Sequence, residues 1–338
     1  MGGDHAPAAA VEGAAIARER YPNVSFLLFG DQAALTSLVA AYPKLAAVSE
    51  IRHTDEVVSA DDKPSQALRR GRGSSMGLAI AAVQEGEADV AVSAGNTGAL
   101  MAMAKFMLKT MPGIDRPALA TILPSSRGEC VMLDLGANVE CDARNLVEFA
   151  VMGAAFARTV LGIPRPRVAL LNVGVEELKG HEEVKEAGQH LKSVDLSFDF
   201  VGFIEGDGIA AGSVDVVATD GFTGNVALKT AEGTARMVTR LFAAAFRSSL
   251  RSKLGALLAK RGLKALKDHL DPNNHNGAVF LGLNGLVVKS HGGANALGFA
   301  SALGVAHDMS ADNLLSRIAA DLENSGDGDG TAEEAAVS

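Results

Sequence analysis

The sequence has few of the residues that stack on nucleic-acid bases or that form disulfide frameworks. It contains no Trp, two Tyr and two Cys, and aromatic residues make up 4% of its 338 positions. The scarcity of aromatic side chains argues against nucleic-acid binding by base stacking. Cys130 and Cys141 do not form a C-x-x-C pair and cannot build a disulfide framework, so a reducing cytoplasm is the expected location.

Positive charge is in deficit and long apolar runs are lacking. The chain carries 31 Lys and Arg against 40 Asp and Glu, a formal net charge of −9, which argues against general binding to phosphate backbones. No apolar run approaches the roughly 18 residues that suggest a spanning helix, and the N-terminus has neither a basic region nor a hydrophobic stretch. We therefore expect neither a transmembrane segment nor a signal peptide.

What the chain does have is a regular alternation of short apolar runs and helical patterns, in a composition that is 48% apolar. Such alternation predicts a doubly wound α/β sheet, and solidly apolar runs are typical of strands covered on both faces. The expected strands are 24–29, 88–93, 118–123, 131–135, 168–172, 198–204, 214–219 and 286–288. The expected helices are 8–20, 98–109, 143–161, 176–191 and 294–303.

Two boundaries follow from composition. Residues 1–322 read as a single two-lobed α/β catalytic domain. Residues 323–338 are acidic, rich in Gly and almost without large apolar side chains, which predicts a disordered tail.

A strand-to-turn pattern, D-V-x-x-[S/T]-x-G-x-T-G, occurs twice, at Asp89–Gly98 and at Asp215–Gly224. One interpretation of this repeat is that turns between a strand and a helix often use Gly and Thr at similar positions, without a shared function. The other is a pair of equivalent loops that face one cleft.

The segment from Arg240 to Lys267 is basic within an acidic chain. It holds eight basic residues and no acidic residue, so the rest of the chain carries −17. Apolar residues at helical spacing predict an amphipathic helical hairpin over residues 240–270. One interpretation is a pair of dimerisation helices whose charges are simply solvated. The other is attachment of the basic residues to an anionic membrane surface. Both hold if the hairpin dimerises at its base, next to the body, and touches lipid at its tip. The expected membrane contacts are Leu254, Leu257, Leu258, Lys260, Arg261 and Lys264.

Several common catalytic signatures are missing. There is no G-x-x-x-x-G-K-[ST], no G-x-G-x-x-G that opens a helix after a strand, and no G-x-S-x-G elbow. The eight His residues are scattered, without H-E-x-x-H or a Cys/His cluster. We therefore expect no metal and no nucleotide cofactor.

Glycine-rich turns at strand ends remain as candidate functional elements. Backbone N–H groups at helix N-termini, with Gly for close approach and Ser, Thr or Asn as further donors, form sites for anions such as phosphate or carboxylate. Ligands of doubly wound sheets bind beyond the carboxyl ends of the strands. The turns are 1–7, 93–98, 136–138, 220–225 and 290–295.

Two charged residues accompany these turns. Lys179 follows the strand 168–172 and could reach a cleft, although a lone lysine is more often a surface residue. Asp220 ends a strand and opens a Gly-rich loop, where an Asp could also simply cap the next helix.

The blocks around these residues resemble the phosphate acyltransferase family, PlsX. The resemblance runs in order from Met1 to about Leu303. It is carried by Met-Gly-Gly-Asp-His-Ala-Pro (1–7), Ser-Ala-Gly-Asn-Thr-Gly-Ala-Leu-Met (93–101), Arg-Pro-Ala-Leu (116–119), Leu-Asp-Leu-Gly-Ala-Asn (133–138), Asn-Val-Gly-Val-Glu-Glu-Leu-Lys-Gly (172–180), Thr-Asp-Gly-Phe-Thr-Gly-Asn (219–225) and Ser-His-Gly-Gly-Ala-Asn (290–295).

The resemblance implies a fold of the isocitrate dehydrogenase and phosphotransacetylase type. It implies transfer of a long-chain fatty acyl group from acyl carrier protein to inorganic phosphate, without a cofactor. The acyl phosphate product would serve phospholipid synthesis. It further implies a homodimer that associates peripherally with the membrane, with the downstream glycerol-3-phosphate acyltransferase as a possible partner.

The resemblance also assigns roles to residues. Lys179 would steady phosphate and the developing oxyanion, and Asp220 would orient Lys179 or accept the phosphate proton. The expected phosphate-binding and substrate-binding residues are Asp4, His5, Ser93, Asn96, Thr97, Asn138, Asn225 and His291.

The chain departs from the family pattern in three places. Members usually carry a short strand before the Met-Gly-Gly turn, so either the true start lies upstream or the sheet lacks a strand. Arg70-Gly-Arg72 has arginines where lysines are common, and the acidic tail has no counterpart. Two other functions stay open: an acyltransferase that uses acyl coenzyme A, and a catalytically idle membrane scaffold.

Overall fold

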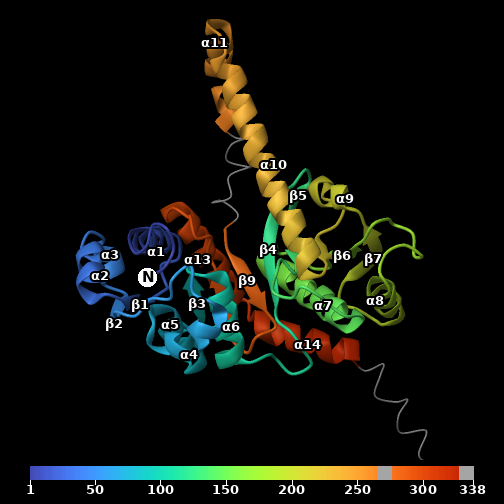
Figure 1. The fold of residues 1–338 in the computed structure, drawn as a ribbon, viewed down its shortest axis with the longest axis horizontal. Coiled ribbons are helices and arrows are strands. Elements are labelled where there is room, and N and C mark those ends of the chain that lie inside the picture. Colours follow the sequence, from blue (N-terminus) through green and yellow to red (C-terminus); the bar gives the residue numbers. More distant parts are fainter. Residues whose placement is uncertain (265–275, 327–338) are drawn as a thin grey trace, which may run out of the picture.

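The computed structural model describes residues 1–264 and 276–326, and its centre is a mixed sheet with strand order β3-β10-β9-β4-β5-β8-β6-β7 (Figure 1). Every run expected to be a strand is one, as the doubly wound pattern predicted. The strands are β3 (Val90–Ser93), β10 (Leu286–Lys289), β9 (Ala278–Leu281), β4 (Ala118–Ser125), β5 (Gly128–Leu133), β8 (Val216–Ala218), β6 (Arg167–Leu171) and β7 (Asp199–Ile204).

Strand directions divide this sheet into two halves. β3 and β10 are parallel, β9 is antiparallel to both β10 and β4, and β4 is antiparallel to β5. β5, β8, β6 and β7 are parallel to one another. The carboxyl ends of β3 and β10 therefore lie at one edge of the sheet, and those of β5, β8 and β6 lie at the other.

Side chains of each strand alternate between two apolar cores. In β5, Val131 and Leu133 face one core, while Cys130 and Met132 face the other, and all four are buried. Helices cover both faces, which explains why the strands read as solidly apolar runs. The first core packs against α7 (Ala143–Val160), α8 (Glu182–Ser193), α13 (Ala296–Ala311) and α14 (Leu314–Gly326). The second packs against α4 (Pro64–Arg70), α5 (Ser75–Gln84), α6 (Thr97–Leu108), α9 (Gly206–Ala211) and α10 (Gly221–Arg247).

The first predicted strand lies outside this sheet. β1 (Phe26–Gly30) pairs in parallel with β2 (Ser49–His53) to form a separate two-stranded sheet. Its small core is completed by α1 (Ala8–Arg20), α2 (Gln32–Val39) and α3 (Pro43–Ala46).

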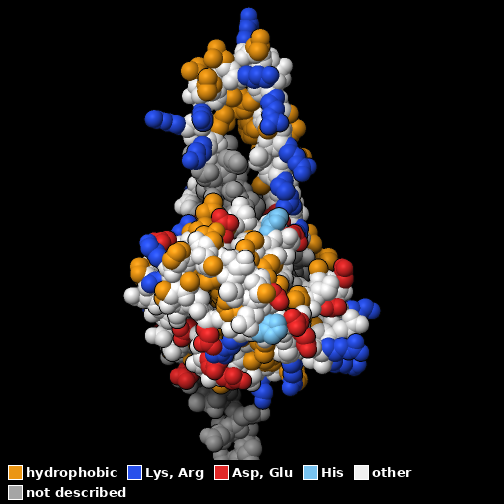
Figure 2. All heavy atoms as spheres, turned by 90° about the vertical axis from the view of Figure 1, so that its left-hand side faces the viewer, with side chains coloured by type: hydrophobic (Ala, Val, Ile, Leu, Met, Phe, Trp, Pro, Cys, Tyr) orange, Lys and Arg blue, Asp and Glu red, His pale blue; other side chains and the backbone are white. Residues whose placement is uncertain are grey.

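The predicted helical hairpin is present and protrudes from the body (Figure 1). α10 runs 27 residues, and α11 (Leu250–Leu258) turns back beside its end, where Ser249 caps α11 by accepting a bond from the Ser252 N–H at 3.0 Å. Figure 2 shows Lys and Arg along the outer sides of the hairpin and apolar side chains at its tip and between its arms. Residues 265–270 of the expected hairpin lie outside the described residues.

Two expected boundaries differ from the observed ones. α8 begins at Glu182 and not at Glu176, because residues 172–180 form a closed loop described below. α14 continues to Gly326, past the expected start of the tail at Glu323, and residues 327–338 lie outside the described chain. No helix in the described part of the chain is both long enough and apolar enough to cross a membrane.

Candidate active site

Four of the predicted site residues lie at one edge of the sheet. Strands β5, β8 and β6 are parallel neighbours, and their carboxyl ends lead to Asn138, to Asp220 and Asn225, and to Lys179. Topology therefore places the proposed reactive pair, Lys179 and Asp220, in the loops after adjacent strands. No direct contact joins the two side chains in this structure.

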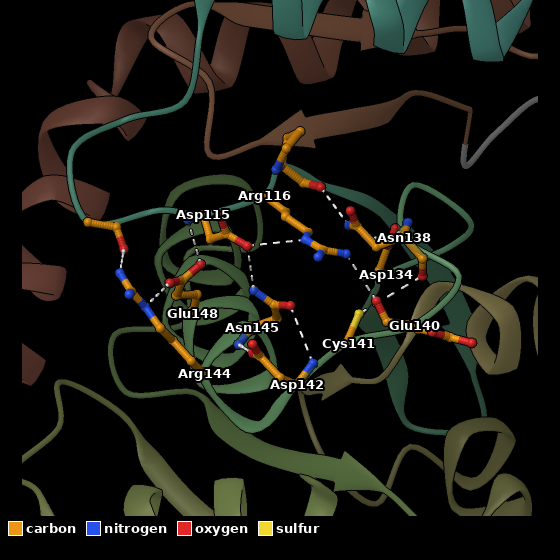
Figure 3. A network of polar contacts seen from close by, with 12 residues as sticks. Asp115, Arg116, Asp134, Asn138, Glu140, Cys141, Asp142, Arg144, Asn145 and Glu148 are labelled. Carbon is orange, nitrogen blue, oxygen red and sulfur yellow. Dashed lines mark hydrogen bonds and ion pairs between the residues drawn. The ribbon is translucent and has the colours of Figure 1, made fainter.

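Asp134 holds the turn that carries Asn138. Its carboxylate accepts bonds from the N–H groups of Leu119 at 2.9 Å, Ala137 at 3.0 Å and Asn138 at 2.6 Å, and from Asn138 Nδ2 at 2.9 Å. The residue is completely buried. Burial raises its pKa, and the bonds from Ala137, Leu119 and Asn138 act against that rise. Figure 3 shows this turn beside a second polar network at the start of α7.

The beginning of α10 packs directly on this turn. The Gly221 N–H donates to the Asn138 carbonyl at 2.7 Å. A Cβ on Gly221 would lie 2.8 Å from Asp134 Oδ2, and one on Gly224 would collide with the Asp134 carbonyl. The two glycines are thus required for the helix N-terminus to approach the turn after β5. Asp220 caps this helix, since its Oδ1 accepts a bond from the Thr223 N–H at 2.8 Å.

Lys179 lies in a loop that closes on itself. Asn172 Nδ2 donates to the Lys179 carbonyl at 3.0 Å, and a Cβ on Gly180, whose φ is +90°, would collide with the Asn172 side chain. The Lys179 ammonium lies 2.9 Å from Glu176 Oε1, and its side chain is 51% exposed. The hydrogen bond with Glu176 raises the pKa of Lys179 and lowers that of Glu176. Lys179 is therefore a half-exposed cation already paired within its own loop.

The other predicted site residues gather at the opposite edge, in the turns after β3 and β10 and in the N-terminal turn. The Asp4 N–H donates to the Gly292 carbonyl at 2.8 Å, and a Cβ on Gly3 would lie 2.9 Å from the Ala94 Cβ. These contacts bring three glycine-rich turns together. The residues concerned are Asp4, His5, Ser93, Asn96, Thr97 and His291.

Several of these side chains already bond to the protein. Asn96 Nδ2 donates to the carbonyls of Ala60 at 2.8 Å and Asp62 at 3.0 Å, and its Oδ1 caps α6 by accepting the Ala99 N–H. Ser93 Oγ accepts the Gly95 N–H at 3.2 Å, and His291 Nδ1 accepts the Gly293 N–H at 3.1 Å. In this structure Asn96 acts as a cap and as an anchor for the loop before α4. Asp4, His5, Thr97, Asn225 and His291 are exposed.

The predicted turns thus form two groups and not one ring. The two copies of the repeated strand-to-turn pattern end β3 and β8, which run in opposite directions, so their loops do not meet at one edge of the sheet. The interpretation of two loops facing one cleft is therefore wrong for these strand ends. Helix α10 links the groups, because it begins directly after Asp220 and brings Lys229 within electrostatic range of Lys289 at the end of β10.

The sequence interpretation missed Lys289, Asp134 and Asn172. Lys289 is 7% exposed, and its desolvation lowers its pKa to about 8. Lys289 directly precedes a matched block, Asn172 opens one and Asp134 lies within one, which was the available signal. An apolar run that ends in Lys reads as a strand that reaches solvent, so burial of this ammonium was not expected.

The thiols and the acidic clusters offer little further chemistry. Burial raises the pKa of Cys130 and of Cys141 to about 12, so neither is a thiolate near neutral pH. Asp31, His53 and Asp55 have potential ligand atoms within 4.8 Å of one another at the two-stranded sheet. Asp31 already caps α2, and His53 Nδ1 accepts a bond from the Gln32 N–H.

Comparison with known proteins identifies the family. The family model described as "Fatty acid synthesis protein" matches residues 1–317. The chain belongs to this family. Among its relatives, the phosphate acyltransferase of Rhodospirillum centenum is 58% identical over 322 residues, which cover 95% of this chain and 91% of that protein. The phosphate acyltransferase of Parvibaculum lavamentivorans is 59% identical over 324 residues, which cover 96% of this chain and 90% of that protein.

Solved structures confirm the fold that the family resemblance implied. A phosphotransacetylase from Streptococcus pyogenes aligns with a TM-score of 0.59 at 18% identity, over 90% of this chain and 91% of its own. The EutD phosphotransacetylase from Staphylococcus aureus aligns with a TM-score of 0.52 at 16% identity, over 89% of this chain and 99% of its own. The family member described here therefore has the phosphotransacetylase fold.

Proposed function

We propose that this protein is an acyltransferase that moves a long-chain fatty acyl group from acyl carrier protein to inorganic phosphate. The acyl phosphate formed would supply phospholipid synthesis. Membership of the fatty acid synthesis family and relatives named phosphate acyltransferase, with 58% and 59% identity over nearly the whole chain, support this reaction. The observation that carries the proposal is the edge where β5, β8 and β6 end together in glycine-rich loops beside a lysine.

Catalysis of this reaction depends on positioning the two substrates and stabilising the developing negative charge, and less on a covalent enzyme intermediate. A phosphate oxygen attacks the thioester carbonyl carbon, and the carbonyl oxygen becomes an oxyanion. The C–S bond then breaks, and the carrier leaves as a thiolate that takes up a proton. Backbone N–H groups and a cation aimed at phosphate and oxyanion supply this catalysis.

Lys179 and Asp220 are the proposed catalytic residues. The Lys179 ammonium would exchange Glu176 for phosphate and for the developing oxyanion. Asp220 would orient Lys179 or accept the phosphate proton, while Asn138 and Asn225 would bind phosphate from the neighbouring turns. At the other edge, Asp4, His5, Ser93, Asn96, Thr97 and His291 would contact the remainder of the substrates, with Asn96 acting through the α6 cap.

The location and assembly form part of the same proposal. We place the protein in the cytoplasm, at the membrane surface, as a homodimer. The protruding basic hairpin supports a peripheral contact with anionic lipid through six exposed residues: Leu254, Leu257, Leu258, Lys260, Arg261 and Lys264.

One assay tests the reaction. Pure protein is incubated with acyl carrier protein thioester and inorganic phosphate, and we expect a hydroxylamine-sensitive acyl product and free carrier thiol. Acyl coenzyme A is tested in parallel, since preference for that donor would replace the proposed substrate. If neither donor gives a product, the interpretation of the protein as a catalytically idle membrane scaffold would be favoured instead.

Variants then test the two proposed catalytic residues. Lys179→Ala should lower kcat by about 10²-fold or more, the usual cost of losing a group that stabilises an oxyanion. Lys185→Ala is the matched control, because Lys185 makes the same i,i+3 ion pair with Glu182 away from the loop. Asp220→Asn keeps a capping side chain and removes the charge. Near-normal turnover in both folded variants would contradict the assignment.

A further inference from the structure

Lys289 is a buried ammonium at the meeting point of three turns. It is the last residue of β10, and its register partners are Ser93 of β3 and Ala278 of β9. Its Nζ donates to the Ala94 carbonyl at 3.4 Å and to the Ser290 carbonyl. The ammonium therefore lies directly at the turns that follow β3 and β10, and 7% of the residue is exposed.

Within the described residues, the ammonium of Lys289 bonds to backbone carbonyls and forms no ion pair. Asp4 is near enough to raise its pKa. The positive charge of Lys229, from α10, acts in the opposite direction. An ammonium in a desolvated position without a paired anion is costly. Two carbonyl acceptors also leave one of its three N–H groups for a further partner.

The turns around Lys289 are built for close approach to their backbone. Gly2 and Gly3 adopt φ values of +112° and +97°, which L-residues rarely adopt, and a Cβ on Gly2 would lie 3.2 Å from the Gly95 Cα. Side chains are thus kept out of this junction. At the start of α6, Asn96 Oδ1 accepts the Ala99 N–H, and the N–H groups of Thr97 and Gly98 have no acceptor within the helix. A cation beside free helix amides and bare glycine backbone has the chemistry of an anion site.

We propose that Lys289 binds a phosphate group of the substrates at the carboxyl ends of β3 and β10, an inference that rests on the proposed acyl transfer. Two sources share this chemistry: inorganic phosphate, and the phosphodiester of the prosthetic arm that carries the acyl group. Lysine suits phosphate as a compact point charge. Lys179, by contrast, already holds Glu176 and lies beyond β6, on the oppositely directed half of the sheet.

Steady-state kinetics of Lys289→Met test the proposal and separate the two sources. We expect KM to rise at least tenfold for one substrate. A rise for inorganic phosphate alone identifies the free anion and would place its site at Lys289 in place of the turns that carry Asn138 and Asn225. A rise for the acylated carrier alone identifies the phosphodiester. In the second case, an acyl pantetheine donor without the phosphodiester should show no difference between the variant and the unmodified protein.

Two further variants separate ligand binding from a structural role. Lys289→Arg retains the charge and should recover at least part of the lost affinity. Lys105→Met removes an exposed lysine from α6 and should leave both KM values unchanged. Unchanged KM values for both substrates in Lys289→Met would overturn the proposal, as would a fall in kcat alone that Arg does not restore.

Direct binding keeps this inference distinct from the proposed reaction. If the unmodified protein makes no acyl phosphate, acyl transfer fails. Lys289 is then tested by the rise in Tm that inorganic phosphate or phosphopantetheine produces, which should be lost in Lys289→Met. If that variant does not fold, lysine acylation of the unmodified protein is mapped by mass spectrometry, and Lys289 should be protected by one of these two probes. Absence of any protection would refute the site.

Discussion

Lys289 links function and stability at the scale of one residue. Its folded-state pKa is about 8 against an ordinary value of 10.5, and the causes are burial and the Lys229 charge, opposed by Asp4. Between these two pH values the unfolded chain still binds the proton that the folded chain has released. The free energy of unfolding therefore rises with pH in that window. Below about pH 8, the folded protein bears the cost of a buried ammonium.

Lys289→Met should consequently stabilise the protein at neutral pH. Without phosphate, we expect its free energy of unfolding at pH 7 to exceed that of the unmodified protein by on the order of 3 kcal/mol, since each pKa unit corresponds to about 1.4 kcal/mol. The difference should shrink as pH rises from 8 towards 10. Urea unfolding at a series of pH values measures it. A difference that stays constant with pH would show that the buried charge is not its source.

Asp134 illustrates the opposite case, a buried charge that is fully bonded. Four N–H donors converge on its carboxylate, two of them from Asn138. In Asp134→Asn, an amide NH₂ would face donors that need an acceptor. We expect a loss of about 3 kcal/mol in the free energy of unfolding, together with reduced turnover, because the Asn138 turn and the start of α10 rest on this residue.

Urea unfolding and turnover of the same Asp134→Asn preparation provide the measurement. Asp199→Asn is the control, since Asp199 makes a half-exposed ion pair with Arg165 that is worth little in water. Equal stability of the two variants would mean that the turn is held by other contacts.

The site residues that the sequence predicted in the α/β body share one property: they lie in or directly beside glycine-rich turns, some of them in the first turn of the helix that follows. Asn138, Asp220 and Asn225 belong to glycine-rich motifs. The backbone conformation of such a motif is determined by a few consecutive residues, so it can be predicted from the local sequence. Lys289 was missed because its burial depends on the N-terminal turn and on α10, which are distant in sequence. The loop at 172–180, where a helix was expected from Glu176, closes through the bond from the Asn172 side chain to the Lys179 carbonyl.

At the scale of elements, the type of each segment was predictable and its direction was not. α1 occupies the expected residues 8–20, since helical spacing and its terminal Tyr21 are local features. β2 was missed because its sequence, Ser-Glu-Ile-Arg-His, is largely polar. β9 was missed as well; it is antiparallel to both β10 and β4, and the antiparallel pair of β4 with β5 then reverses the second half of the sheet. The hydrophobic periodicity of a strand does not indicate its direction in the sheet. The two groups of turns were therefore predicted to lie at the same edge of the sheet.

The hairpin is the element whose sequence and structure agree in most detail. α10 and α11 place Leu250, Leu254, Leu257 and Leu258 at the tip with exposures of 84%, 60%, 66% and 82%. Lys260, Arg261 and Lys264 are exposed beside them. Apolar side chains ringed by cations fit the surface of an anionic bilayer, where each Lys or Arg contributes about 1 kcal/mol.

Reversing these three charges should release the protein from vesicles. We expect Lys260→Glu, Arg261→Glu and Lys264→Glu together to abolish sedimentation with phosphatidylglycerol vesicles and to leave turnover of soluble substrate intact. A control with the same change in net charge on the body is Lys44→Glu, Arg165→Glu and Lys192→Glu. Loss of turnover with normal vesicle binding would assign the basic tip to acyl carrier protein in place of lipid.

Charge is divided over the whole molecule. The basic stretch 240–267 carries +8, and the remainder of the chain carries −17. An acidic body is repelled by an anionic surface, so in the proposed membrane contact the hairpin would hold that body away while its tip touches the lipid. Vesicle binding should therefore weaken steeply with added salt.

The lower part of α10 offers a surface for a second copy of the chain. Phe222, Val226, Met237 and Leu241 repeat at helical spacing, with exposures of 65%, 50%, 55% and 61%. This stripe begins at the body and ends where the basic segment starts. An exposed apolar stripe on a helix that leaves its own core is typical of a subunit contact. A homodimer through α10 would cover it and would leave both basic tips directed to the same membrane.

Glutamates in the stripe should therefore separate the subunits. We expect the unmodified protein to sediment as a dimer of its 34.7 kDa chain and Met237→Glu with Leu241→Glu to sediment as a monomer, because the charges would be buried unpaired at the contact. Thr239→Glu, on the opposite side of the same helix, is the control and should remain dimeric. A monomeric unmodified protein, or a double variant that stays dimeric, would place the contact elsewhere. If vesicle binding weakens along with dimerisation, two tips acting together are required to hold the acidic body at the bilayer.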